Sequence, residues 1–320
     1  MIKFLVDSSC DLTPNSELCD LFVPISVTID GKTYKDGIDL NTDTFYELLT
    51  SSEDFPKTAQ PSPAEFTEVF EQIKNDGDEI ICFLLSSGLS GTYQSANIAK
   101  SMVDYDKIYI VDTKTATRMI GVLVKYARDL AAKGVSASEI VEKCEQLKSK
   151  VKVIAGVDTL EYLYKGGRLS RTSAAVGTLA GIKPIITVTE DGKVETLGKC
   201  IGKARTMQFI QKKLDDTQID ENFPIISLYT VGEDNIKELE SSLKAKGYDI
   251  SERLQIGSTI GAHIGPNVYG ILYVEKIFWL YFHLKNSAIY SKFLLTNAQY
   301  IVIIDYAPQQ TKGIYIYEDY

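Results

Sequence analysis

The sequence has few histidines, a deficit of basic residues and no paired cysteine motif. Its 34 lysines and arginines against 43 aspartates and glutamates give a formal net charge of -9. This leaves no basic field to attract phosphates, so we expect neither nucleic-acid binding nor attraction to acidic lipid surfaces. The five cysteines are scattered without a CxxC pair, which argues against a disulfide framework and a metal site. A reducing cytoplasm fits this composition.

Long apolar runs and nucleotide motifs are also missing. The apolar run before Asp7 is too short for the core of a signal peptide, and the run 277–282 is too short to cross a bilayer. GxxxxGK[ST] does not occur, and the glycines of 257–270 lack the spacing of a dinucleotide fingerprint. We therefore expect no integral membrane contact, no nucleotide site on this chain and no cofactor.

Alternating strand and helix patterns predict the α/β class with two domains. Residues 1–149 read as an α/β/α three-layer, Rossmann-like domain with a mainly parallel sheet, into which a β-hairpin near 22–40 is inserted. Residues 150–276 read as a two-layer α/β domain with a mixed sheet. The aromatic-rich residues 277–320 have no clear helical stripe and are predicted to be an appended extension.

The string SSGLSGTYQSA, residues 86–96, is the first candidate site. It follows an apolar strand and opens a helix, which is an arrangement that presents backbone N–H groups and hydroxyls to an anion. Ser90 is the candidate hydroxyl donor, and Gly91 allows a ligand to approach the backbone. The alternative is that Ser90 only caps the following helix.

Two further segments carry candidate donors. Thr58 has no evident local role, whereas Ser62 lies in a Ser-Pro-Ala-Glu capping box and has a structural alternative as the helix N-cap. His263 lies in a Gly- and Pro-rich loop rather than on an apolar helix face. The basic residues Arg168 and Arg171 follow a predicted helix stop, where they either face phosphate or a partner, or simply remain solvated.

A serine hydrolase is the alternative function. Ser90 would attack, His263 would act as the base, and either Asp112 or Asp158 would complete a triad. The local string GLSGT departs from the GxSxG nucleophile elbow, because the second glycine comes one position early.

Taken together, these motifs resemble the DegV family, the fatty-acid-binding subunits of bacterial fatty acid kinase. The matching strings occur in family order between residues 1 and 276: VDSSCDL (6–12), TAQPSPAEF (58–66), SSGLSGTYQSA (86–96), VDT (111–113), GVDTLEYLYKGGRLS (156–170), IKPII (182–186) and IGAHIGPNVYG (260–270). Three positions depart from the family pattern: Asn267 stands where a glycine is common, and Arg118 and Met119 stand where small or apolar residues and glycine are usual, in a segment that could line an acyl tunnel.

The resemblance implies a lipid site between two α/β domains. A long-chain fatty acid would bind there, with its carboxylate held by Thr58, Ser62, Ser90, Gly91 and His263. A separate ATP-dependent kinase subunit would then phosphorylate the bound acid, with Arg168 and Arg171 near the phosphate or the kinase. The implied protein is a cytoplasmic carrier in bacterial phospholipid synthesis without catalytic residues of its own, and a transient contact with a membrane surface for lipid exchange remains open.

Overall fold

The computed structural model describes residues 1–169, 181–276, 300–305 and 313–318, the last two ranges as backbone only. Residues Met1–Glu275 form one compact unit, and Lys276–Tyr320 form a second. The first unit contains a parallel sheet and a mixed sheet, and the predicted α/β class is confirmed. The domain boundary near Ser149 stays a prediction.

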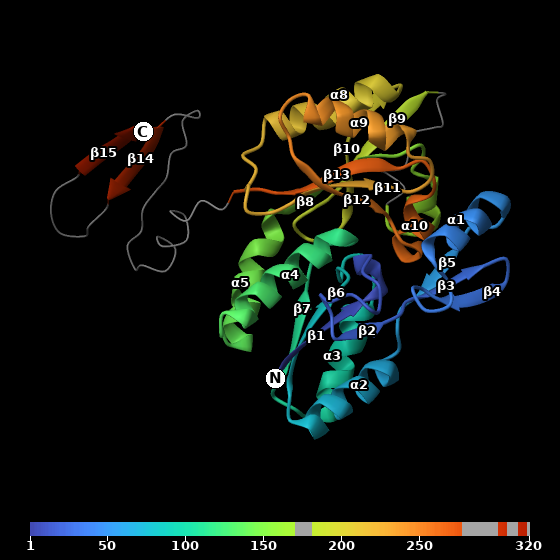
Figure 1. Ribbon diagram of the computed structural model, residues 1–320, viewed down its shortest axis with the longest axis vertical. Helices are drawn as coiled ribbons and strands as arrows, with labels where there is room; N and C mark the ends of the chain where they lie inside the picture. Colours follow the sequence, from blue (N-terminus) through green and yellow to red (C-terminus); the bar gives the residue numbers. More distant parts are fainter. Residues whose placement is uncertain (170–180, 277–299, 306–312, 319–320) are drawn as a thin grey trace. The chain divides into compact units, whose positions relative to one another are not determined.

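The parallel sheet has the strand order β2-β1-β6-β7. Its strands are β1 (Ile2–Asp7), β2 (Leu21–Val23), β6 (Glu79–Leu84) and β7 (Ile108–Asp112). Helices α2 (Pro63–Asp76) and α3 (Thr92–Val103) lie on one side of it, and α4 (Arg118–Ala132) and α5 (Ala137–Leu147) lie on the other (Figure 1). Ile80, Cys82 and Leu84 of β6 pack with α2 and α3. The residues between them point to the opposite face, because side chains alternate along a strand.

The predicted hairpin forms two strands of a small three-stranded sheet with the order β4-β3-β5. Strands β3 (Ser26–Ile29) and β4 (Lys32–Lys35) are joined through Asp30 and Gly31, both of which have positive φ, as a type I′ turn requires. Strand β5 (Lys57–Ala59) pairs with the other edge of β3, and α1 (Thr42–Ser51) connects β4 to β5. The hairpin therefore supports β5, the strand that carries Thr58.

The mixed sheet has the strand order β10-β9-β8-β13-β11-β12. Its strands are β8 (Val151–Gly156), β9 (Ile182–Val188), β10 (Val194–Ile201), β11 (Ile225–Tyr229), β12 (Ile250–Gln255) and β13 (Tyr269–Val274). Helices α8 (Lys203–Asp215) and α9 (Asp234–Lys244) cover its outer face (Figure 1). This is the predicted two-layer arrangement, with one face of the sheet left for another contact.

The remaining helices of the described ranges are short. They are the 3-10 helices η1 (Ser8–Cys10) and η2 (Lys148–Lys150) and the α-helices α6 (Glu161–Lys165) and α10 (Ser258–Ile264). In the second unit, β14 (Tyr300–Asp305) and β15 (Gly313–Glu318) pair as an antiparallel hairpin. No helix within the described ranges is long and apolar enough to cross a membrane.

Candidate functional site

A cavity of about 830 Å³, including the space at its mouth, lies between the loops that follow the parallel strands and the inner face of the mixed sheet. Most of the lining is apolar. The polar lining residues are Thr58, Ser90, Thr117, Arg168, Thr187, Thr259 and His263. The cavity is therefore suited to an apolar ligand that carries a polar group.

The inner wall of the cavity follows from the alternation of the mixed-sheet strands. Ile154 and Ile185 belong to the core under α8 and α9. Their neighbours Val153 and Ile186 point to the other face and line the cavity. In the sequence, apolar residues at consecutive positions indicate a strand that is buried on both faces. That pattern does not say that one face is covered by a ligand space rather than by protein.

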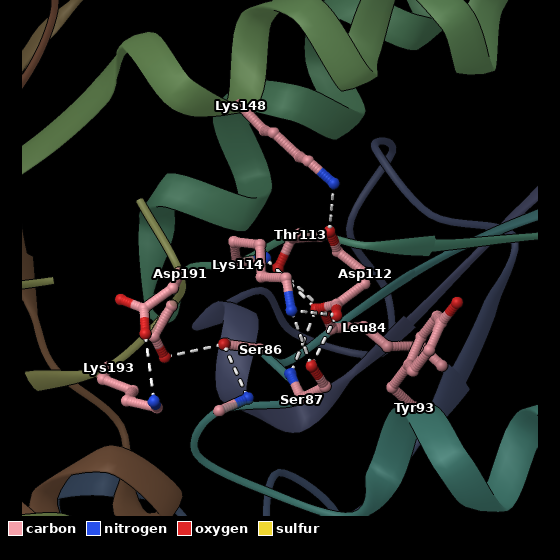
Figure 2. A network of polar contacts seen from close by, with 12 residues as sticks. Leu84, Ser86, Ser87, Tyr93, Asp112, Thr113, Lys114, Lys148, Asp191 and Lys193 are labelled. Atoms are coloured by element: carbon pink, nitrogen blue, oxygen red, sulfur yellow. Dashed lines mark hydrogen bonds and ion pairs between the residues drawn. The ribbon is translucent and has the colours of Figure 1, made fainter. Parts of the chain in front are cut away.

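Hydrogen bonds of Ser86 and Ser87 fix the start of the loop that carries Ser90. The carboxylate of Asp112 accepts hydrogen bonds from the backbone N–H of Ser87 at 3.0 Å and from its hydroxyl at 2.5 Å (Figure 2). The hydroxyl of Ser86 donates to the carbonyl of Gly192, in the turn between β9 and β10, at 2.7 Å. The loop is thereby joined to the hairpin of the mixed sheet that forms the opposite wall.

The motif VDSSCDL anchors the same loop from β1. Asp7 is fully buried, and its carboxylate accepts hydrogen bonds from the backbone N–H of Ser9 at 2.9 Å and of Leu85 at 2.7 Å. Burial raises the pKa of Asp7 to about 6. Because Leu85 lines the cavity, the hydrogen bond from its backbone N–H to Asp7 fixes this part of the cavity wall.

Thr58 and His263 are brought together although they lie 205 residues apart. The Thr58 hydroxyl is 2.9 Å from Nε2 of His263. Thr58 is paired with Val27 in the small sheet. His263 lies in the last turn of α10, so the predicted loop position is wrong, because the helix continues up to its C-cap at Gly265. Both residues line the cavity together with Ser90. The structure thus places three of the predicted carboxylate donors around one space.

The imidazole of His263 is neutral at physiological pH. Burial lowers its pKa from 6.5 to about 4, and the positive charge of Arg168 acts in the same direction. Within the described part of the chain, Nδ1 has no hydrogen-bond partner. The nitrogen on the Thr58 side is Nε2, and a neutral imidazole can donate or accept a hydrogen bond there according to its tautomer.

Arg168 bridges two walls of the cavity. Its Nε donates to the carbonyl of Leu89 at 2.9 Å, and its Nη1 donates to the carbonyl of Gly166 at 2.5 Å. Burial lowers the pKa of its guanidinium, which nevertheless stays charged near neutral pH. Arg171 lies outside the described residues.

Two predicted residues are not part of the cavity lining. Ser62 is exposed and caps α2 in a complete capping box with Glu65, so its structural alternative is the one observed. Gly91 is the N-cap of α3, and the side chain of Gln60 lies against it. The predicted alternative that Ser90 caps this helix is observed in part: the N-cap residue is Gly91, but the Ser90 hydroxyl accepts a hydrogen bond from the first helical N–H, that of Thr92, at 3.3 Å.

Sequence reasoning missed the two acidic residues that hold α10. Asp11 accepts a hydrogen bond from the backbone N–H of Gly257 at 3.0 Å. Asp36 accepts from the backbone N–H and the hydroxyl of Thr259, at 3.1 Å and 2.5 Å. Nothing in the sequence around Asp36 indicates that this carboxylate is buried. Its position next to a hairpin predicts an exposed loop residue.

Two of the departing residues, Asn267 and Met119, have a clear place in the structure. Asn267 has a φ of 59°, so asparagine takes the left-handed conformation that a glycine would favour there. Met119 is buried and lines the cavity. It follows Thr117, whose φ of 56° is costly for a β-branched residue and whose hydroxyl donates to Asp11.

The arrangement of a serine hydrolase is not assembled by the described residues. Ser90 contacts the hydroxyl of Thr92 at 2.9 Å, and His263 contacts Thr58. The two candidate acids are engaged elsewhere, Asp112 with Lys114 and Asp158 with Lys183, each at 2.7 Å. No acid therefore orients the imidazole in this part of the chain. Residues 1–169 and 181–276 also contain no group of His, Cys, Asp and Glu suited to a metal ion.

Mild acidification should stabilise the protein. Burial raises the pKa of Asp7 to about 6 and of Asp11 to about 7, from 3.8. The folded chain therefore binds protons that the unfolded chain releases, and the free energy of unfolding increases as pH falls through this range. His263 opposes this, because its folded pKa of about 4 lies below 6.5. The raised pKa values of Asp7 and Asp11 outweigh the lowered pKa of His263 in this range, and burial raises the pKa of Asp36 as well. The melting temperature should therefore rise by about 2–4 °C between about pH 7.5 and pH 6.

Scanning calorimetry across this range is the measurement. The variant Asp11→Asn should flatten the pH dependence, because it removes the carboxyl group with the higher pKa of the two. A melting temperature that falls steadily over the same interval would contradict the assignment of protons to these buried carboxyl groups.

Comparison with known proteins places this geometry in context. The DegV family model, described as an uncharacterised protein family, matches residues 1–276. A DegV domain-containing protein of Caldanaerobacter subterraneus is 39% identical over 257 residues, which cover 79% of this chain and 91% of that protein.

Two solved structures are similar to this fold. A fatty-acid-binding DegV family protein from Thermus thermophilus superposes with a TM-score of 0.76 at 29% identity, covering 86% of this chain and 99% of that one. A stearic-acid-binding protein from Eubacterium ventriosum gives the same TM-score, identity and coverage.

Proposed function

Because the chain belongs to the DegV family, we propose that it binds a long-chain fatty acid in the cavity between its two sheets. The hydrocarbon tail lies along the apolar walls, and the carboxylate lies at Thr58, Ser90 and His263. One observation carries this proposal: a single cavity joins an extensive apolar lining to these three uncharged donors. The fatty acids bound by proteins of the same fold from Thermus thermophilus and Eubacterium ventriosum support it.

The tail supplies most of the affinity and the carboxylate supplies the orientation. Burial of a methylene contributes about 0.8 kcal/mol, so about fourteen methylenes contribute about 11 kcal/mol before the entropy costs of binding. A hydrogen bond to a charged group adds only about 1.5–3 kcal/mol. Loss of one donor should therefore misplace the carboxylate more than it releases the lipid.

The neutral donors also suit a further reaction of the carboxylate. Hydroxyl and imidazole groups hold the oxygens without the bidentate pairing of an arginine, which would reduce their nucleophilicity. A carboxylate oxygen then attacks the γ-phosphorus of ATP held by a separate kinase subunit. The new bond gives an acyl phosphate, and the bond from phosphorus to ADP breaks. In this proposal the chain is a cytoplasmic carrier for phospholipid synthesis, without a cofactor or a catalytic residue, and exchanges lipid at the membrane surface.

Arg168 faces the kinase in this proposal, and Arg171, to which the sequence assigns the same role, lies outside the described residues. Arg168 is charged, partly exposed and adjacent to the donors, so it can neighbour the transferred phosphoryl group. Charge reversal in Arg168→Glu should lower the rate of acyl-phosphate formation at least about tenfold and change lipid binding less. The matched control is Arg205→Glu on the outer helix α8, where the side chain is exposed. Equal rates for the two variants in the coupled assay would remove Arg168 from this role.

Lipid extraction tests the proposed function itself. The purified chain is denatured, extracted and analysed by mass spectrometry, and lipid-free protein is then offered palmitate and oleate. We expect one long-chain fatty acid per chain. A protein that carries none and takes up neither acid would refute the proposal.

A further inference from the structure

The contact between Thr58 and His263 needs support from elsewhere in the molecule. The two side chains come from distant segments and share one hydrogen bond of 2.9 Å. Such a bond contributes only about 1 kcal/mol net, which is too little to hold β5 and α10 against each other. The small sheet fixes Thr58 from one side, and Asp36 fixes the start of α10 from the other. Ala262, next to His263, also packs into the apolar core of the small sheet and α1. None of these contacts reaches the loop that precedes β5.

The ring of Tyr162 contacts both that loop and the end of α10. Its centroid lies 4.8 Å from that of Phe55, which precedes Thr58 by three residues. The ring also lies against Gly265, two residues after His263. A side chain at Gly265 would come within 2.4 Å of the ring, so only a glycine allows this approach. Tyr162 also packs against the apolar core of the small sheet and α1.

The backbone that follows Tyr162 forms the wall behind the imidazole. The carbonyl of Tyr162 accepts a hydrogen bond from the N–H of Gly166 at 2.8 Å. A side chain at Gly166 would lie 2.3 Å from Nδ1 of His263, so the imidazole rests directly on this glycine. The same residue therefore holds the segment before Thr58 through its ring and the support of His263 through its carbonyl.

Lys165 reinforces the contact with Phe55. Its ammonium group lies 3.7 Å from the centroid of the Phe55 ring, which is a favourable cation–π distance. Lys165 also pairs with Glu161 at 2.9 Å within α6. The turn of α6 is thus attached to the Phe55 loop at two points.

We propose that Tyr162 is a positioning residue that holds Thr58 and His263 in register around the carboxylate of the bound lipid. Its effect on the lipid rests on the proposed function, whereas its effect on the two side chains does not. Removal of the ring would free the Phe55 loop and open the imidazole to water. Removal of the hydroxyl alone would leave both ring contacts in place.

Titration of His263 by NMR is the test, because burial holds the pKa of this imidazole at about 4. The chain has two histidines, so His283→Gln in every sample leaves one imidazole signal. We expect the pKa to rise by about one unit or more in Tyr162→Ala, as water reaches the ring. It should stay at its parent value in Tyr162→Phe. The matched control is Tyr126→Ala, which removes a ring that faces Phe223 at 6.0 Å, and it should also leave the pKa unchanged.

A second variant covers the case in which Tyr162→Ala does not fold. Phe55→Ala removes the ring partner from a partly exposed loop position and should raise the same pKa by a smaller amount. An unchanged pKa in whichever of these two variants folds would overturn the proposal, as would an equal rise in Tyr126→Ala. Failure of the parent protein to bind fatty acid would contradict the proposed function instead. The titration would still test whether Tyr162 positions His263.

Discussion

Ala116→Phe should weaken fatty-acid binding by about 100-fold or more. Ala116 is 5% exposed and lines the cavity in the segment between β7 and α4. A phenyl ring there would occupy the space of several methylenes of the tail, and about four displaced methylenes correspond to about 3 kcal/mol. The dissociation constant, measured by displacement of a fluorescent fatty acid, reports this loss.

Two variants separate a filled cavity from a damaged fold. Ala116→Ser keeps the size of the side chain and should bind lipid within about threefold of the parent. Met102→Phe enlarges a side chain that is 65% exposed on α3 and should have no effect. Parent-like binding by a folded Ala116→Phe protein would show that the tail does not pass this point of the cavity.

Ser90→Ala and His263→Ala should separate the placement of the carboxylate from the retention of the lipid. Each variant removes one donor worth about 1.5–3 kcal/mol to a carboxylate, so we expect lipid binding to weaken by about tenfold. Acyl-phosphate formation should fall by about 100-fold or more, because a misaligned oxygen loses the geometry of attack as well as the contact. The coupled assay with the kinase subunit and ATP, run at saturating fatty acid, measures the second quantity.

Equal losses in lipid binding and in acyl-phosphate formation would mean that Ser90 and His263 only bind the lipid and do not orient its carboxylate. Thr187→Val is the matched control, because Thr187 also lines the cavity but donates its hydroxyl to the carbonyl of Val153 at 2.7 Å. Its bond partner lies within the mixed sheet, so this variant should affect both assays alike.

Local signals in the sequence predicted the parts of the fold that depend on neighbouring residues. The Asp30-Gly31 turn and the capping box at Ser62 were predictable because each is specified within a few residues. The α/β class followed from the alternation of strands and helices. Helix α3 shows the limit of this reasoning, since a serine at position 90 favours a cap but the chain turns into the helix one residue later.

The site could be predicted only through resemblance, because its contacts join segments that are distant in the sequence. Nothing near Thr58 indicates that it meets His263, and nothing near Asp36 indicates that it holds Thr259. Tyr162 reads as an ordinary aromatic residue of an amphipathic turn, and its role depends on glycines that lie elsewhere in the fold. Long-range packing of this kind leaves no local pattern.

The most direct test of the central claim is a crystal structure of the chain with palmitate bound. The account predicts that the carboxylate lies within hydrogen-bond distance of Ser90 and of the Thr58 and His263 pair, with the tail against Val153 and Ile186 of the mixed sheet. A fatty acid bound elsewhere, or one bound here with its carboxylate directed away from these donors, would contradict it.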